Sequence, residues 1–174
     1  MDFGQFDQRA KAEAGVMVQL HQPYDKTAKI EDENGPCGFM VRGVAAKSVQ
    51  ERLAALQKKA GKAKDGEDEQ AVLERIHESQ IEAAMGYIIE AVNISIAGKP
   101  VATAEGIRAV LGMTFPDLRL VQDENGKQIY QSVKNDDGEW VGVPKFEVAN
   151  DTFAMQVIKA AEDGARFFGK TSAA

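Results

Sequence analysis

The side chains that most often carry out enzyme chemistry are scarce in this chain, which has two histidines and one cysteine among 174 residues. Cys37 would need a base beside it to act as a nucleophile, and His21 on the preceding segment is the one candidate. His77 is followed by Glu78 but lacks a second histidine at the spacing of a helical zinc motif. A small buried cysteine, a strand histidine and a helix-surface histidine explain these residues better. The sequence therefore predicts a protein that is not an enzyme, with no catalytic, cofactor-binding or metal-binding residues.

Segments rich in glycine and acidic residues are predicted to be turns rather than ligand sites. Residues 35–38 and 98–100 lack the lysine–serine or lysine–threonine ending of a phosphate-binding loop. Residues 123–126 and 135–138 lack the alternating oxygen ligands and the final glutamate of an EF-hand. Hairpin turns account for these segments.

Composition narrows the classes of partner. The formal net charge is -6, and a net negative protein repels the phosphate backbones of nucleic acids. The lysines of residues 58–64 run directly into acidic residues 65–69, which indicates a solvated linker. The first residues do not form a signal peptide, and no segment approaches the roughly 20 apolar residues of a membrane span. We therefore expect a cytoplasmic protein that binds neither nucleic acid nor membranes.

The first part of the chain predicts a short helix followed by a β-hairpin. Helix formers occupy residues 6–14, and Gly15 supplies a stop. Residues 16–21 and 38–44 are rich in strand formers, with turn residues at 32–35 between them. The simplest arrangement of the two strands is an antiparallel hairpin.

Helical spacing of apolar residues follows. Residues 45–60 and 69–92 each predict a helix, and the charged, glycine-bearing residues 61–68 predict the linker between them. We expect this antiparallel helical pair to pack on the hairpin. After a short turn, Thr103 is a candidate N-cap of a short helix that Gly112 ends.

The last part predicts a small β-meander and a final helix. Strand formers over residues 118–148 flank turn signals at 125–126 and 135–138. A helix capped by Asn150 or Asp151 follows, and residues 169–174 are an expected frayed tail.

The expected fold class is α+β. It is helix-dominated, with an N-terminal β-hairpin and a small β-meander insertion before a C-terminal helix. The expected units are residues 1–117 as the hairpin and helical core, 118–148 as the insertion, and 149–174 as the C-terminal helix that packs on the core.

Apolar and aromatic residues supply the candidate protein-binding sites. The helix over 69–92 has an apolar stripe wide enough for both a core and a partner. Tyr130, Trp140 and Phe146 cluster in the meander, where they form either a recognition surface or a miniature core. Two adjacent phenylalanines in the last helix cannot both face the core without a wide buried face. The candidate partner-binding residues are Val72, Ile76, Tyr87, Ile88, Trp140, Phe167 and Phe168.

Three stretches carry a family resemblance. The first stretch is an Ala/Glu-rich helix followed by Gly15, a strand and Pro23. The second, residues 82–116, holds the sequence Asn-Ile-Ser-Ile-Ala-Gly-Lys-Pro and then a short helix. The third is the final helix, which ends in two phenylalanines. In this order, the stretches resemble the tail assembly chaperones of long-tailed bacteriophages. Two features depart from that group: Tyr87 stands where a tryptophan is expected, and residues 118–148 are extra.

The resemblance implies a non-enzymatic role in the host cytoplasm. Such chaperones bind the tape measure protein, keep its long hydrophobic helices soluble and recruit tail tube subunits. Self-association is a further expectation. The alternative is a virion structural protein, such as a tail or head accessory subunit, that uses the meander for contacts between subunits.

Overall fold

A three-stranded antiparallel sheet lies at the centre of the computed structural model, which describes residues 8–59, 68–116, 118–149 and 151–168. The strand order is β1 (Val16–Gln19), β6 (Gly38–Val41) and β7 (Ile88–Val92). Strands β1 and β6 pair antiparallel as predicted, with Val18 opposite Phe39. Because Phe39 is completely buried and Val18 nearly so, this pairing supplies the inner face of the core. The predicted α+β class is confirmed.

Strand β7 corrects the prediction of one helix over residues 69–92. Helix α3 (Glu69–Tyr87) ends earlier, and Ile88 adopts an extended conformation with φ -75° and ψ 134°. Ile88–Val92 then pairs with β6, which places Ala91 opposite Phe39. The β-branched residues of this segment favour a strand, and pairing with β6 satisfies their backbone groups. Tertiary pairing therefore overrides the helical periodicity.

The connection between β1 and β6 is more structured than one predicted turn. It contains two short hairpins, β2 (His21–Gln22) with β3 (Asp25–Lys29) and β4 (Glu31–Asp32) with β5 (Gly35–Pro36). Ile30 joins them, because its N–H donates to the carbonyl of Leu20 and its carbonyl accepts from Cys37 N–H.

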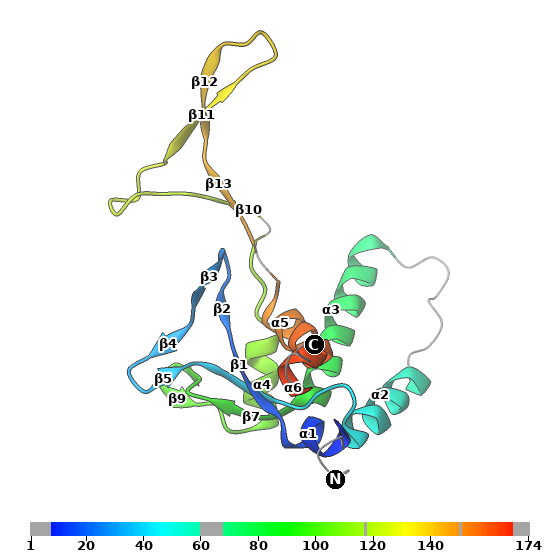
Figure 1. Cartoon of the computed structure of the whole chain (residues 1–174). Coiled ribbons are helices and arrows are strands. Elements are labelled where there is room, and N and C mark those ends of the chain that lie inside the picture. The colour runs from blue at the N-terminus through cyan, green and yellow to red at the C-terminus, as the bar shows by residue number, and fades with distance from the viewer. Residues whose placement is uncertain (1–7, 60–67, 117, 150, 169–174) are drawn as a thin grey trace, which may run out of the picture.

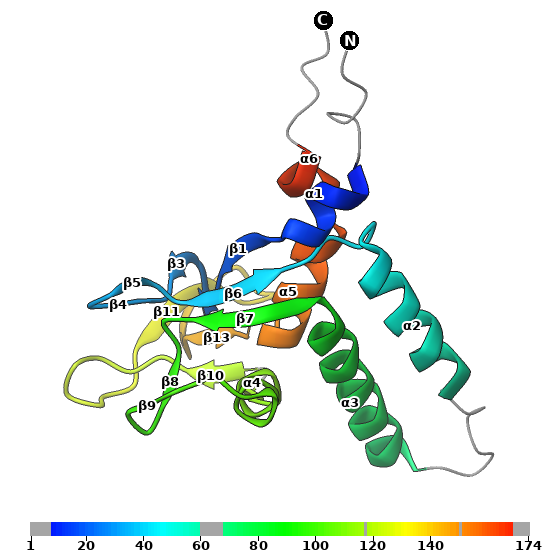
Figure 2. The same cartoon turned by 90° about the horizontal axis from the view of Figure 1, so that it is seen from below.

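Helices pack together on one side of the sheet. Helix α5 (Phe153–Glu162) contacts β6, α3 and α4 (Ala104–Leu111), and Figure 2 shows it behind the sheet. Helix α2 (Lys47–Lys59) contacts α3 and runs in the opposite direction, as expected for the predicted helical pair (Figure 2). Helix α1 (Gln8–Ala14) contacts α6 (Gly164–Phe168). The completely buried side chains come from these elements, the sheet and the residue before α2: Ala12, Phe39, Val41, Ala46, Val49, Ala84, Leu111, Ala154 and Val157.

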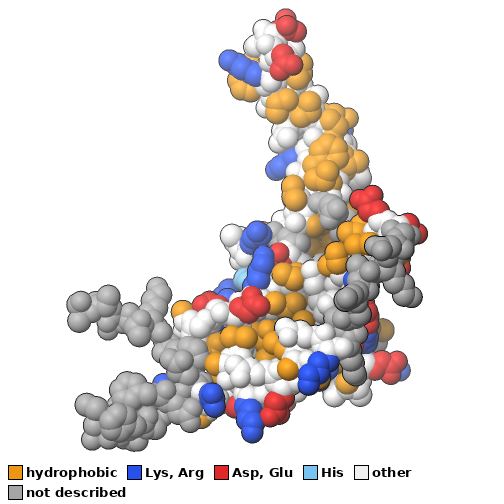
Figure 3. All heavy atoms as spheres, turned by 90° about the vertical axis from the view of Figure 1, so that its right-hand side faces the viewer, with side chains coloured by type: hydrophobic (Ala, Val, Ile, Leu, Met, Phe, Trp, Pro, Cys, Tyr) orange, Lys and Arg blue, Asp and Glu red, His pale blue; other side chains and the backbone are white. Residues whose placement is uncertain are grey.

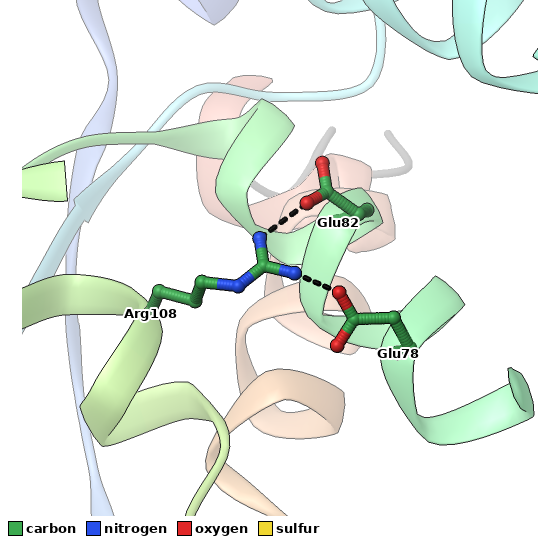
Figure 4. A network of polar contacts seen from close by, with 3 residues as sticks. All are labelled: Glu78, Glu82 and Arg108. Carbon is green, nitrogen blue, oxygen red and sulfur yellow. Dashed lines mark hydrogen bonds and ion pairs between the residues drawn. The ribbon is translucent and has the colours of Figure 1, made fainter. Parts of the chain in front are cut away.

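An arginine bridge holds α4 against α3. Arg108 donates to the carboxylates of Glu78 and Glu82, which are four residues apart on α3 and so share one face of that helix (Figure 4). The N-terminus of α4 is capped as predicted, because the Thr103 hydroxyl accepts from Gly106 N–H. A two-strand turn, β8 (Ser95–Ile96) with β9 (Lys99–Pro100), leads into α4.

The cap of α5 differs from the prediction. Thr152 rather than Asp151 accepts a hydrogen bond from Met155 N–H, and Asn150 lies outside the described residues. The predicted linker also lies outside them except for Asp68, which caps α3. The predicted tail over 169–174 lies outside them entirely.

Residues 118–148 form a β-arm that stands away from the rest of the protein (Figure 1). We call this segment the arm and the other described residues the body. At its base, β10 (Leu118–Leu120) pairs with β13 (Phe146–Val148), and further out β11 (Tyr130–Lys134) pairs with β12 (Trp140–Pro144). One pairing of the predicted meander is therefore confirmed, since β11 and β12 pair around the turn at 135–138. The other is wrong, because the first strand, β10, joins β13 and not its neighbour β11. The turn at 125–126 closes only a side hairpin, where Gln122 bridges Gln128.

Candidate protein-binding surface

The strand register gathers large apolar side chains on one face of the arm. At the base, Leu118 lies opposite Val148 and Leu120 opposite Phe146; further out, Tyr130 lies opposite Pro144. Trp140 is paired with Lys134 near the far turn. Because successive side chains of a strand alternate between faces, these positions share one side of the ribbon. We call this side the arm face and define it by Leu118, Leu120, Tyr130, Trp140, Pro144, Phe146 and Val148.

The arm face is open to solvent. The exposed fractions of its side chains reach 69% for Trp140, 67% for Val148 and 62% for Tyr130. On the opposite side of the ribbon, Val133 and Val141 are exposed at only 36%. Figure 3 shows apolar side chains along the length of the arm. The alternative that Tyr130, Trp140 and Phe146 form a closed miniature core is therefore wrong.

The area of this apolar face is large for a monomer surface. Leu118, Phe146 and Leu120 add exposed fractions of 57%, 49% and 47%. With about 150–250 Å² for a whole aromatic side chain and somewhat less for an aliphatic one, the six exposed side chains present roughly 700 Å². The largest apolar patch of a typical monomer is about 300–600 Å², and a larger one marks an interaction site.

Charged side chains are placed away from this surface. Arg119 and Glu147 pair on the other side of the base, with Arg119 Nη2 2.7 Å from Glu147 Oε2. Among the paired positions of the arm face, Lys134 is the charged one, and its Nζ lies 5.5 Å from the centre of the Trp140 ring. The face is therefore an uncharged band that ends in a single cation near the far turn.

The body holds the base of the arm through Tyr24. The Tyr24 hydroxyl donates to the Pro116 carbonyl at 2.9 Å, and the Arg119 guanidinium lies 4.0 Å from the centre of its ring. A hollow of about 510 Å³ beside them is lined by Pro23, Phe115 and Glu147 among others. Because Arg119 and Glu147 already pair with each other, this hollow serves as the junction of arm and body.

The predicted partner-binding residues divide by burial. Trp140 lies on the arm face, and Ile76 is 47% exposed on α3 beside Leu73, which is 60% exposed. Val72 is half-buried on the same helix. These positions offer surface to a partner, and whether they bind one stays a prediction.

Three predicted residues are interior in this fold. Tyr87, Ile88 and Phe167 are exposed at only 3%, 9% and 8%. Burial, and then the nearby Glu162 carboxylate, raise the pKa of Tyr87. Phe167 packs so closely that a Cβ added to Gly43 would lie 3.1 Å from its ring. The side chain of Phe168 lies outside the described residues.

Sequence reasoning missed most of the arm face. Leu118, Leu120 and Val148 alternate with charged residues, which is the signal of a two-sided strand. That signal does not say which side is covered, and the mistaken meander pairing hid their common face.

The structure also places the two residues considered for nucleophilic chemistry. Cys37 is buried, and its thiol contacts the carbonyl oxygen of Gly35 at 3.8 Å. Burial, and then the negative charge of Asp32, raise the pKa of Cys37, which disfavours the reactive thiolate. The backbone N–H of His21 donates to Gln156 Oε1 at 2.9 Å, so this residue ties β2 to α5.

Comparison of the chain with protein families, with curated proteins and with solved structures finds no match. The resemblance to tail assembly chaperones therefore stays a prediction. Within the described ranges, no helix combines the length and the apolar content needed to cross a bilayer.

Proposed function

We propose that this protein is a non-enzymatic tail assembly chaperone of a long-tailed bacteriophage, which binds the tape measure protein and recruits tail tube subunits. The resemblance of its opening, middle and closing stretches suggests the class. The observation that carries the proposal is the arm face, with Trp140, Val148 and Tyr130 all more than 60% exposed. A surface of this kind costs solubility unless a partner covers it.

The dimensions of the arm face suit an amphipathic helix. Residues 140–148 run through β12 and β13, and at about 3.3 Å per residue they span roughly 27 Å. A helix rises about 1.5 Å per residue, so some 18 residues of a client would lie along this length. Apolar side chains at helical spacing would then contact the aromatic and aliphatic residues of the ribbon.

The arrangement of charge supports reversible binding. The turns of the arm carry acidic residues, including Asp123, Glu124, Asp136 and Asp137, and the whole chain has a net charge of -6. These charges keep the free protein soluble, while the uncharged band leaves the contact area without buried ions.

Co-expression tests this proposal. The full chain is produced with tape measure fragments, and we expect the fragments to stay soluble and to co-purify with it. Replacing Trp140 and Tyr130 by serine should abolish capture, whereas Val133→Ser and Val141→Ser on the opposite side should not. Capture that is unchanged by the first pair would contradict a role for the arm face. Fragments that stay insoluble beside the native chain would contradict the proposed function.

A virion structural protein is the second candidate. The observation that favours it is the arm itself, because a ribbon that stands away from its own body can reach into a neighbouring subunit (Figure 1). Mass spectrometry of purified particles beside the infected-cell lysate separates the two. A chaperone is found only in the lysate, whereas a structural subunit is found in the particle at defined stoichiometry.

A further inference from the structure

We infer that in the free protein the arm face is covered by the arm face of a second copy, in an antiparallel two-fold dimer. This inference adds to the proposed function, since it concerns the same face before a client arrives. Its test needs no client.

The area is the first argument. Each copy presents roughly 700 Å² of apolar side chain on this face. A standard stable interface buries about 800 Å² per partner. Two arm faces packed on each other would bury roughly 1,400 Å² in total, which lies within the range of about 1,200–2,000 Å² for stable interfaces, without any contact between the bodies.

The shape of the face is the second argument. Its middle is low, because Gly142 lies opposite Ser132 and an added Cβ at Gly142 would meet no atom within 4 Å. Four residues further along the chain, in β13, Phe146 is 49% exposed and stands opposite Leu120. The face thus carries a notch at Gly142 and a projection at Phe146, with Pro144 between them.

An antiparallel arrangement fits these features into each other. Consider a two-fold axis that lies in the plane of the interface, perpendicular to the strands, at the level of Tyr130 and Pro144. It places position 144 of one copy over position 144 of the other. Phe146 then lies over the Gly142 of the second copy, and Leu120 over its Ser132. Trp140 lies over Val148 at the ends. Phe146, Leu120 and Trp140 thus meet smaller side chains of the second copy, as two packed sheets require, whereas Tyr130 and Pro144 each meet their own copy at the axis.

The parallel arrangement fits poorly. A two-fold axis along the arm would place Gly142 over Ser132 and so leave a void in the centre of the interface. It would also bring the two bodies together, and each chain has a net charge of -6. In the antiparallel dimer the bodies lie at opposite ends, where salt screens their repulsion over about 10 Å.

The charges on the face agree with the antiparallel dimer. The stem of Lys134 would lie over Leu118 of the second copy at the edge of the interface, where its ammonium group remains in water. Arg119 and Glu147 point to the other side of the ribbon and stay hydrated.

Sedimentation equilibrium of the full chain tests the inference. At micromolar concentrations we expect a particle of twice the 18.9 kDa of the single chain. Gly142→Leu fills the notch that receives Phe146, and its dimer should dissociate at concentrations at least about tenfold higher. The added side chain fits the free arm, since nothing lies near that position. Val141→Leu adds bulk to the opposite side and should leave the dimer unchanged.

Gly142→Leu also separates a specific dimer from non-specific apolar association. Because the variant is more apolar than the native chain, non-specific association would increase rather than weaken. A native chain that stays monomeric up to about 100 μM, or a Gly142→Leu dimer as tight as the native one, overturns the inference.

Crosslinking tests the position of the axis. A short bismaleimide should couple two copies of Pro144→Cys, since this position faces itself across the two-fold axis. It should not couple copies of Val143→Cys, which is the next residue on the opposite side, or of the native chain, whose Cys37 is buried. Equal coupling of both variants would contradict the arrangement.

The two proposals fail separately. If the protein is a monomer that captures tape measure fragments, the dimer inference is contradicted and the proposed function is not. If it is a dimer that captures no fragments, the proposed function is contradicted and the dimer inference is not.

Discussion

Lys134 and Trp140 stand opposite each other on β11 and β12, with the Lys134 ammonium nitrogen 5.5 Å from the centre of the indole ring. A cation over an exposed indole ring contributes about 0.5–1 kcal/mol. This pair orients the tryptophan at the far end of the arm face, although 69% of the side chain remains in water. The most exposed large apolar residue of the arm is therefore held in place before any partner arrives.

We predict that Trp140→Ser reduces the apolar surface of the arm but hardly changes the stability of the fold. Since the side chain is mostly exposed, the free energy of unfolding should change by less than about 1 kcal/mol. At a concentration low enough to keep the chain monomeric, fluorescence of a dye that binds apolar surface should fall, because the largest element of the arm face is gone. Urea unfolding and dye titration measure the two effects. A loss of several kcal/mol would mean that Trp140 supports the fold, and Val141→Ser is the matched control.

Arg108→Met should loosen α4 from α3. The substitution removes both ion pairs with Glu78 and Glu82 while keeping an apolar stem of similar length. Because the arginine side chain is 39% exposed, we expect a loss of only about 0.5–1 kcal/mol in the free energy of unfolding. The difference from the native chain should shrink in about 1 M salt, which screens exposed charges. Lys26→Met, at an exposed position of β3, should show no such salt dependence.

Gly38→Ala should disrupt the pairing of β1 with β6. An added Cβ would lie 2.0 Å from the carbonyl oxygen of Val18, a backbone atom that cannot move without breaking the ladder. We expect a loss of more than about 3 kcal/mol, measured by thermal or urea unfolding. Gly142→Ala is the control, because nothing lies within 4 Å of the corresponding Cβ. Equal stability of the two variants would contradict the close approach of the strands.

Acid should weaken the contact between α1 and α2 through Glu13. The Ser48 N–H and hydroxyl donate to its carboxylate at 2.9 and 2.8 Å, and Arg42 lies beside it. These hydrogen bonds, led by the backbone N–H of Ser48, lower the pKa of Glu13 below its usual 4.5. A lowered folded-state pKa adds stability above pH 4.5, and this stability is lost as pH falls through the folded value.

Glu13→Gln tests whether stability falls with pH through this carboxylate. The variant should lose stability relative to the native chain at pH 7 and approach it at pH 3, as followed by urea unfolding at both values. Ser48→Ala should behave in the same direction. A stability difference that is constant over this range would exclude Glu13 as the source.

The sequence by itself predicted the features that depend on a few neighbouring residues. Gly15 ends α1 with φ 77°, and Gly138 closes the far turn of the arm with φ 81°, because only glycine adopts such angles at little cost. Thr103 caps α4 for an equally local reason. Enough of these signals were correct to predict the α+β class.

Pairing between distant segments was decided by the tertiary structure. Ile88 continues a helical stripe in the sequence, but an extended segment there completes the sheet beside β6. Tertiary packing also buries Tyr87, Ile88 and Phe167, which the helical periodicity alone had predicted to be available to a partner. Phe146 pairs with Leu120, although both the side hairpin and the β11–β12 hairpin lie between them in the sequence. The turn signal at 125–126 had instead predicted that the first strand pairs with the second.

The arm shows most clearly what the sequence alone cannot predict. Alternation in Leu118–Leu120 and Phe146–Val148 determined that each strand has an apolar side. Whether that side is covered depends on where the ribbon stands, because burial is a property of the neighbours and not of the residue. The fold directs the arm away from the body, and this placement alone turns Trp140, Tyr130 and Phe146 from candidate core residues into an exposed face.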